Sequence, residues 1–252
     1  MNADLELAER AARRAGELLM ARFGGPARGV SAKSSATDMV SDADREAEAA
    51  IVDLLARERP DDAVLGEEGA GERGSSGRRW VVDPLDGTTN YLYGHPQWCV
   101  SVALEDGDGG LAGVVYDPAR GETFRAARGA GAELNGDPIR VRDHDDLATA
   151  LIATGFGYDA ERRAAQAELA RRVLPRVRDI RRAGAAALDL AWLAAGRLDG
   201  YYERGLNPWD WAAGSLLVTE AGGVVEPLRG EPFGIVAAGP RLVEPLRRLV
   251  DS

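Results

Sequence analysis

Two aspartates, Asp83 and Asp86, stand three residues apart directly after the apolar run of residues 80–82. The proline between them restricts the backbone, and the glycine that follows permits a tight bend. Both carboxylates and the Leu85 carbonyl could therefore converge on a hard cation, which prefers oxygen ligands. Two aspartates that merely cap turns are the alternative interpretation of this segment.

Gly87 and Thr88 come next and occupy an expected helix start. Backbone N–H groups in the first turn of a helix have no partner within the helix, and they favour a phosphate oxygen. A cation site and an anion site would then lie side by side.

Two further acidic segments stand far from this one in the chain. Glu67 and Glu68 lie between glycines after the apolar residues 63–65, where either a metal ion or plain exposure to water would accommodate paired carboxylates. Asp210 lies between Trp209 and Trp211 at the beginning of an apolar helix. An acid suits a helix N-terminus, but the flanking aromatic residues favour burial, and a buried carboxylate needs a cation or hydrogen-bond donors.

Together these segments resemble the inositol monophosphatase family, within the wider group of lithium-sensitive, magnesium-dependent phosphomonoesterases. The resemblance covers almost the whole chain, and the order and separation of its motifs make it specific. In chain order the motifs are Lys33 with Thr37-Asp38 and Asp44, Gly66-Glu67-Glu68, residues 83–88, Trp209-Asp210 and Ala221-Gly222-Gly223.

The resemblance implies a metal site for Mg²⁺ built from carboxylates. One ion would be held by Glu67, Asp83 and the Leu85 carbonyl, and a second by Asp83, Asp86 and Asp210. Glu67 and water would help to hold a third, looser ion. Asp83 would then bridge two cations, as in other two-metal phosphatases.

The same resemblance assigns catalytic roles to Glu67, Thr88 and Asp44. Glu67 and Thr88 would orient the attacking water and take its proton, while Asp44 fixes the Thr88 hydroxyl. It also implies a set of substrate contacts: Asp86, Gly87, Thr88, Gly184, Ala185 and Glu203. Among them, Glu203 would accept hydrogen bonds from vicinal hydroxyl groups of the substrate. The alternative interpretation of Glu203 is a surface acid at the end of a strand.

Two positions qualify the resemblance. Ala185 stands where many relatives place a hydroxyl residue, which weakens the inositol assignment and leaves the phosphatase assignment untouched. Lys33 resembles a family position near the metal entrance, although an exposed lysine would explain it equally well.

The expected substrate is a small phosphorylated metabolite, and inositol 1-phosphate is favoured because residues 90–96 look more like the inositol branch than like its relatives. Histidinol phosphate, fructose 1,6-bisphosphate, NADP and a nucleotide 3′-phosphate are the alternatives, since the metal core handles phosphate rather than the leaving alcohol. Similar bacterial proteins also act as regulatory binding partners of the transcription machinery, so a regulatory binding protein is the second function class. A structural protein whose acids are only caps and loop charges is the third.

Composition limits the partners. With 41 acidic and 31 basic residues the 252-residue chain has a formal charge of -10, which disfavours nucleic acid and anionic lipid. The arginines of residues 162–182 alternate with apolar residues, as on a solvated helix face.

Cys99 is the only cysteine and is expected in a buried strand. The N-terminus is unlike a signal peptide and no apolar run could span a membrane, so we expect a cytoplasmic protein.

The elements that must position these residues follow from the apolar spacing. Two helices are expected over residues 5–19 and 42–59, and a mainly antiparallel sheet over residues 80–141. Beyond residue 145 strands and helices alternate, with strands at 147–154 and 177–179 and helices at 161–174, 185–195 and 208–220.

The expected fold class is therefore mixed α/β, of the α+β layered kind. By resemblance it consists of the alternating helix and sheet layers of inositol monophosphatase and fructose-1,6-bisphosphatase. We expect one unit, residues 1–252, whose halves are approximately 1–145, with the metal-binding helices and sheet, and 146–252, with the substrate contacts and Asp210. Relatives are commonly homodimers, and the apolar middle strands could supply an interface.

Overall fold

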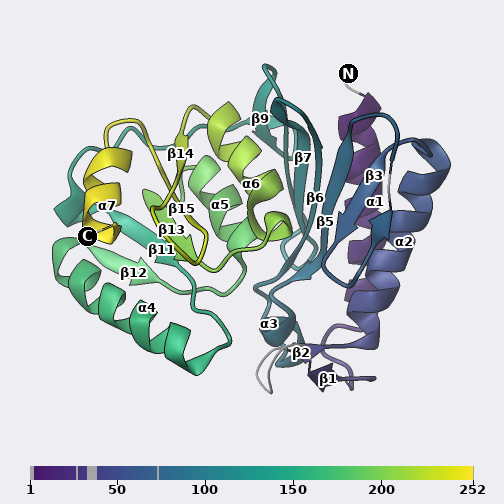
Figure 1. Cartoon of the computed structure of the whole chain (residues 1–252), viewed down its shortest axis with the longest axis horizontal. Coiled ribbons are helices and arrows are strands. Elements are labelled where there is room, and N and C mark those ends of the chain that lie inside the picture. The colour runs from purple at the N-terminus through teal and green to yellow at the C-terminus, as the bar shows by residue number, and fades with distance from the viewer. Residues whose placement is uncertain (1–2, 27, 33–38, 73, 252) are drawn as a thin grey trace.

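Helices and sheets alternate in layers across the molecule (Figure 1). The computed structural model describes residues 3–26, 28–32, 39–72 and 74–251. Helices α1 (Ala3–Met20) and α2 (Asp42–Glu58) cover the outer face of the first sheet, and α5 (Ala186–Ala194) and α6 (Pro208–Glu220) lie between the two sheets. Helices α4 (Ala160–Val173) and α7 (Val243–Val250) cover the far side of the second sheet.

The first sheet is antiparallel apart from one parallel pair, β3 with β5. This confirms the expected middle section of locally connected strands. In spatial order its strands are β10 (Asp137–Pro138), β9 (Gly131–Leu134), β8 (Glu122–Ala127), β7 (Gly109–Asp117), β6 (Cys99–Asp106), β5 (Arg79–Asp86), β3 (Ala63–Gly66) and β4 (Gly71–Glu72).

The second sheet is mixed. Strand β11 pairs in parallel with both β12 and β13, whereas β15 pairs antiparallel with β13 and β14. In spatial order its strands are β12 (Asp179–Arg181), β11 (Leu151–Thr154), β13 (Gly200–Arg204), β15 (Gly234–Ala238) and β14 (Val224–Pro227).

Short elements complete the description. The strands β1 (Ser31–Ala32) and β2 (Met39–Val40) form a small antiparallel pair, and α3 (Thr88–Leu92) follows β5 directly. Two 3₁₀ turns, η1 (Leu147–Thr149) and η2 (Leu174–Arg176), precede β11 and β12.

The central helices explain the layering. Helices α5 and α6 are apolar around most of their circumference, as a helix buried on both sides must be. Glycine permits the closest approaches, because a Cβ at Gly113 of β7 would stand 3.1 Å from the Ala213 backbone of α6. The apolar core of this layer is therefore shared by both sheets.

The mixed α/β fold is confirmed, and both outer N-terminal helices lie where apolar spacing predicts them. Two local predictions were wrong. Residues 147–149 form a 3₁₀ turn rather than the start of a strand, because Asp146 caps the Ala148 amide and tightens the chain. The strand expected at residues 177–179 begins two residues later, since β12 covers Asp179–Arg181. The division into halves near residue 145 stays a prediction.

None of the described helices combines the length and the apolar character that crossing a membrane requires.

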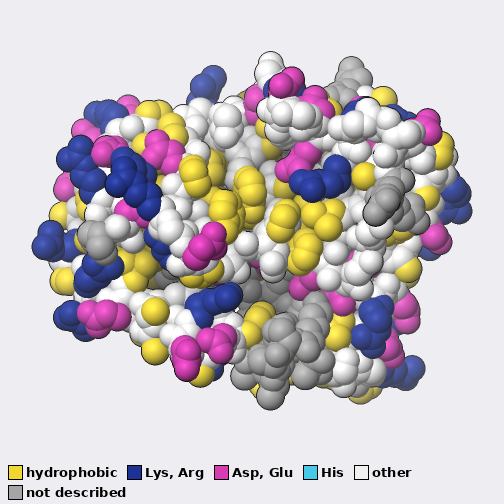
Figure 2. All heavy atoms as spheres, in the orientation of Figure 1, with side chains coloured by type: hydrophobic (Ala, Val, Ile, Leu, Met, Phe, Trp, Pro, Cys, Tyr) yellow, Lys and Arg dark blue, Asp and Glu magenta, His cyan; other side chains and the backbone are white. Residues whose placement is uncertain are grey.

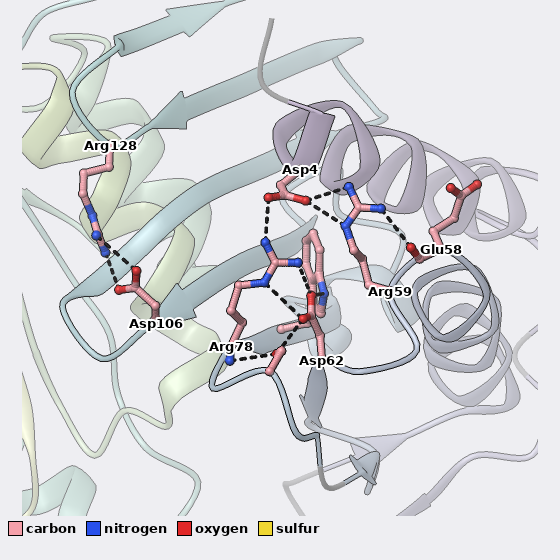
Figure 3. Close-up of polar contacts among 9 residues, drawn as sticks. Asp4, Glu58, Arg59, Asp62, Arg78, Asp106 and Arg128 are labelled. Carbon is pink, nitrogen blue, oxygen red and sulfur yellow. Dashed lines mark hydrogen bonds and ion pairs between the residues drawn. The ribbon is translucent and has the colours of Figure 1, made fainter.

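A buried ionic cluster joins the turn before β3 to the start of β5 (Figure 3). Asp62 is buried, and its carboxylate accepts hydrogen bonds from Arg78 Nη2 at 2.7 Å, Ser76 Oγ at 2.7 Å and Trp80 Nε1 at 3.0 Å. Burial opposes ionisation of this carboxyl, but the bonds from Arg78 and Ser76 still hold its pKa below the usual value. Arg78 also donates to Asp4 at 2.9 Å, which ties α1 to the sheet.

Replacing Asp62 by alanine should destabilise the protein by about 3 kcal/mol, because the change leaves Arg78 and the Trp80 indole N–H without their buried acceptor. Denaturant unfolding would measure the loss. Asp106→Ala is the matched control, since Asp106 pairs with Arg128 at the surface (Figure 3) and surface pairs contribute little. Equal losses in both variants would contradict the assignment.

Candidate active site

One cavity gathers almost all of the predicted site residues. It has a volume of about 450 Å³ and is lined by residues from Glu67 to Asp210, and Figure 2 shows a recess on this face with acidic and basic side chains at its edges. Among the residues predicted from the sequence, Asp44 lies behind the cavity wall and Lys33 lies outside the described residues. Those that line the cavity are Glu67, Asp83, Leu85, Asp86, Gly87, Thr88, Gly184, Ala185, Glu203 and Asp210.

A bulge at the end of β5 places Asp83 and Asp86 on the same cavity. Asp83 is opposite Ser101 and Asp86 is opposite Cys99, so β5 has one more residue than β6 between these two positions. In a regular strand, side chains three residues apart point to opposite faces. The extra residue corrects this alternation, as bulges next to active sites commonly do.

Asp86 joins the first sheet to α5. Its Oδ1 accepts from the Ala186 amide at 3.2 Å and its Oδ2 from the Ala187 amide at 2.8 Å. The N-cap residue of α5, Ala185, offers no side-chain hydrogen bond. The carboxylate therefore caps the helix from another element, where the free amides and the helix dipole both favour negative charge.

Thr88 is held by the start of α2. Its hydroxyl lies 2.9 Å from Asp44 Oδ1 and 3.1 Å from the Leu85 carbonyl, and it can donate to one of them at a time. Asp44 is buried, and its other oxygen accepts from the Ser41 amide at 2.9 Å. Because Ser41 also caps α2, the capping box of this helix fixes the Thr88 hydroxyl.

Gly87 provides the turn between β5 and α3. Its φ of 94° lies in the left-handed region, and an added Cβ would stand 2.8 Å from the Gln97 carbonyl oxygen. Any other residue would be strained here, which explains the glycine.

Glu48, which the sequence analysis did not single out, positions the loop that carries Glu67. Its two carboxylate oxygens accept from the backbone amides of Glu68 at 2.8 Å and Ala70 at 3.0 Å. Glu48 is buried on α2, next to an apolar stripe. The sequence offered one signal for a buried role of Glu48, namely that this charged residue stands next to the apolar positions Ala47 and Ile51.

Asp210 enters the cavity from the first turn of α6. Its Oδ2 accepts from the Asn207 amide at 2.7 Å, which closes the N-terminus of the helix. Asp210 is therefore both an acid of the first turn of α6 and a residue of the cavity lining.

The cavity concentrates negative charge. Burial, and then the charges of Glu67, Asp86 and Asp210, raise the pKa of Asp83 well above its usual value. Burial likewise raises the pKa of Asp210, and it raises the pKa of Asp86 to about 6 despite the two amides that stabilise its charge. These carboxylates favour protons or metal cations.

The donor set fits a divalent cation. In the part of the chain that the structure describes, Asp83, Asp86 and Asp210 form no ion pair with Lys or Arg. Among the described residues, the cavity lining supplies carboxylate, hydroxyl and carbonyl oxygens and contains no cysteine or histidine, which suits Mg²⁺ rather than a softer metal. The same part of the chain contains no ready-made cluster of three or more ligating side chains. Mg²⁺ keeps several waters as ligands and needs no closed cage of protein side chains.

Glu203 lies on the opposite side of the cavity, on β13. It accepts a hydrogen bond at 2.8 Å from the hydroxyl of buried Tyr201, two residues earlier on the same face of the strand. Burial raises the pKa of Glu203 to about 7, and the Tyr201 hydrogen bond opposes the rise. An acid that is half protonated near neutral pH can both accept and donate hydrogen bonds to hydroxyl groups.

Three further cavity residues were missed by the sequence analysis. Asp189 of α5 is buried, and its Oδ1 has no hydrogen-bond partner among the described residues. Its sequence signal was an acid inside an apolar helix. Arg162 and Arg182 also line the cavity, although the spacing of residues 162–182 predicted only a solvated helix face.

Metal-free protein should lose thermal stability as the pH rises from about 4 to about 7. The folded state holds protons on Asp86, up to about pH 6, and on Glu203, up to about pH 7, that the unfolded chain releases near its ordinary values. Folded protein therefore binds more protons within this window, and stability falls as the pH rises through it. Melting temperatures in EDTA would measure the effect.

In the Asp83→Asn variant, the melting temperature should fall less steeply with pH. At pH 8 this variant should melt at or above the melting temperature of the unmodified protein, because it lacks one of the repelling charges. The surface variant Asp106→Asn serves as the control and should keep the original slope. A melting temperature that rises with pH in the unmodified protein would refute the electrostatic interpretation.

Known proteins resemble this chain along most of its length. The Nus factor SuhB of Escherichia coli is 41% identical over 251 residues, which cover 97% of this chain and 94% of that protein. An inositol-1-monophosphatase of Mycobacterium leprae is 45% identical over 231 residues, which cover 86% of this chain and 79% of that protein. The crystal structure of the extragenic suppressor protein suhB of Bartonella henselae superposes with a TM-score of 0.93 at 40% identity, covering 100% of this chain and 99% of that one.

The family assignment covers nearly every residue. A model of the inositol monophosphatase family matches residues 2–250. The chain therefore belongs to the inositol monophosphatase family and is a phosphoric monoester hydrolase.

Proposed function

We propose that this enzyme is a Mg²⁺-dependent phosphomonoesterase that hydrolyses a small polyol phosphate, with inositol 1-phosphate as the expected substrate. The observation that carries the proposal is the convergence of Glu67, Asp83, Asp86 and Asp210, from three separated segments, on one cavity. Membership of the inositol monophosphatase family supports it.

The proposed metal ligands are the carboxylates of one end of the cavity. Glu67, Asp83 and the Leu85 carbonyl would hold one Mg²⁺, and Asp83, Asp86 and Asp210 a second, with Glu67 near a third. When bound, Mg²⁺ supplies charge neutralisation for the phosphate and lowers the pKa of water.

Thr88 and Glu67 would orient the attacking water and accept its proton. Asp44 supports this role of Thr88, because it lies 2.9 Å from the hydroxyl and directs the lone pairs of the threonine oxygen away from itself. Glu48 holds the Glu67 loop through two backbone amides. The backbone amides of Gly87 and Thr88 are the proposed donors to the phosphate oxygens.

The leaving alcohol is proposed to lie toward Gly184, Ala185 and Glu203. Glu203 would accept hydrogen bonds from vicinal hydroxyl groups, and the Tyr201 hydroxyl fixes its orientation. Ala185 is almost fully buried and presents no hydroxyl, so the substrate is recognised here by backbone groups and Glu203. Histidinol phosphate, fructose 1,6-bisphosphate, NADP and nucleotide 3′-phosphates remain as alternatives that share the phosphate site.

A regulatory binding role is the second proposal. It is supported by the 41% identity, across 97% of the chain, to a protein named Nus factor SuhB. Binding of RNA polymerase complexes by a catalytically inactive variant would test this role, since it does not require turnover.

A homodimer in the cytoplasm is proposed as the working state, and analytical ultracentrifugation would test the oligomer.

Phosphate release from a panel of monoesters would test the enzymatic proposal. The panel consists of inositol 1-phosphate, glycerol 2-phosphate, fructose 1,6-bisphosphate, histidinol phosphate, NADP and a nucleotide 3′-phosphate, each with Mg²⁺ or EDTA. Release that depends on Mg²⁺ and is fastest with inositol 1-phosphate is the expected result. Absence of release with every substrate and divalent metal would overturn the proposal.

Asp83→Asn should lower turnover more than about a thousandfold without unfolding the chain, because one amide replaces the carboxylate shared by both proposed ions. Steady-state kinetics at saturating Mg²⁺, with circular dichroism to verify folding, would measure the effect. Asp106→Asn is the control for loss of one acidic charge. Activity within tenfold of the unmodified enzyme would exclude a bridging role.

Glu203→Ala should lower kcat/KM for inositol 1-phosphate about tenfold, the typical value of hydrogen bonds to a charged group, and should affect p-nitrophenyl phosphate far less. The aryl ester lacks the vicinal hydroxyl groups that Glu203 is proposed to bind. Parallel kinetics with both substrates would measure the change in preference. An equal loss on both would mean that Glu203 acts on the phosphate end or on folding.

A further inference from the structure

Asp189 is a carboxylate that the packing of the protein does not explain. It lies on α5, whose other residues from Ala186 to Ala194 are all apolar. Asp189 is only 2% exposed, its Oδ1 is buried, and no hydrogen bond to this carboxylate occurs among the described residues. A buried carboxylate without hydrogen-bond donors costs free energy, so its presence calls for a functional reason.

Asp189 lines the cavity on the side where the leaving alcohol is proposed to lie. Ala185, at the N-cap of α5, stands four residues earlier, and residues with this spacing lie one turn apart on the same face of a helix. Ala185 has no hydroxyl group to offer a substrate. The next polar side chain along α5 is that of Asp189, one turn further into the cavity wall.

Glu203 is the second acid on this side of the cavity. It comes from β13, which packs against α5 (Figure 1), and it accepts the Tyr201 hydroxyl at 2.8 Å. Burial, and then the charge of Glu203, raise the pKa of Asp189 well above its usual value, so the two acids are near neighbours. Two elements thus bring one acid that has a partner next to one that has none.

The other charged residues on this side have contacts of their own. Asp159 caps α4 by accepting the Arg162 amide at 2.9 Å, and Arg204 forms an ion pair near the C-terminus. Arg182 only partly offsets the rise that burial causes in the pKa of Asp189, and it forms no ion pair with this residue. Charges of both signs line this side, so the unpartnered acid is a more specific signal than the net charge.

We propose that Asp189 is a specificity-determining residue, which binds a hydroxyl group of the leaving alcohol from the side of α5 while Glu203 binds from the side of β13. This inference rests on the proposed phosphatase function. A carboxylate accepts a hydrogen bond from a hydroxyl group, and a protonated carboxyl can also donate one, so the contact forms in either state. Binding of a polyol would then satisfy a group that the fold leaves unsatisfied.

Inositol 1-phosphate and cyclohexyl phosphate form a matched pair of test substrates. They share the ring and the phosphate and differ only in hydroxyl groups. Their intrinsic reactivities differ by the same factor for every variant, so a change in the ratio of their kcat/KM values reports the hydroxyl contacts. Asp189→Ala should lower this ratio about tenfold, mainly through the KM of inositol 1-phosphate.

Thermal stability without substrate gives an independent readout. Asp189→Ala removes a buried carboxylate that has no hydrogen bond and introduces a better helix former, so it should melt at or above the temperature of the unmodified protein. Asp199 is the matched control, because it is buried and does not line the cavity, and its Oδ2 accepts the Leu151 amide at 2.8 Å. Asp199→Ala should melt about 3 °C or more lower and leave the substrate ratio unchanged.

Asp189→Asn is the conservative variant. It keeps the shape of the side chain and one acceptor oxygen, so it should keep part of the preference for inositol 1-phosphate. A ratio that Asp189→Ala leaves unchanged, while both esters are still hydrolysed, would overturn the inference. Equal losses on both esters with a lower melting temperature would assign Asp189 to folding and would also overturn it. Absence of hydrolysis of every ester would refute the phosphatase function, and the inference with it.

Discussion

The Asp86 carboxylate is the contact on which the site depends. It leaves the end of a buried strand of the first sheet and accepts the Ala186 and Ala187 amides at the N-terminus of α5, which has no capping side chain of its own. Helix α5 packs between the sheets, so this hydrogen-bonded carboxylate links the strand that carries Asp83 to a helix that also contacts β13, the strand that carries Glu203. The same two hydrogen bonds to Asp86 thus cap α5 and hold this carboxylate in the cavity wall.

Concentration of like charge is the second constraint. Burying several carboxylates around one cavity costs free energy, which the raised pKa values of Asp83, Asp86 and Asp210 express. The fold tolerates this cost because other contacts compensate for it, such as the apolar layers and the Asp62 cluster between α1 and the first sheet. A divalent cation would relieve the same repulsion. Stability and metal binding are therefore coupled through one set of side chains.

Supporting residues do as much for the geometry as the residues that line the cavity. Asp44 and Ser41 hold Thr88 through the capping box of α2, and Glu48 holds the Glu67 loop from the same helix. Helix α2 thus positions two segments that are about twenty residues apart, and neither supporting carboxylate faces the cavity. The opposite wall combines Glu203, Asp189, Arg162 and Arg182, and this side of the cavity is the one proposed to bind the leaving alcohol.

The sequence by itself determined the acidic segments, the helix that starts after Gly87, the mixed α/β class and the family, because these depend on local spacing and on motifs in a fixed order. It also placed Asp83, Asp86 and Asp210 in one predicted site, although their roles stay predictions. Only the tertiary structure decided what comes from elements distant in the chain: the β5 bulge, the capping of α5 by Asp86, the support by Glu48, and the positions of Asp189, Arg162 and Arg182 in the cavity wall. An isolated arginine or aspartate on a helix has the same local pattern whether it faces solvent or a cavity, and only packing against other elements separates the two.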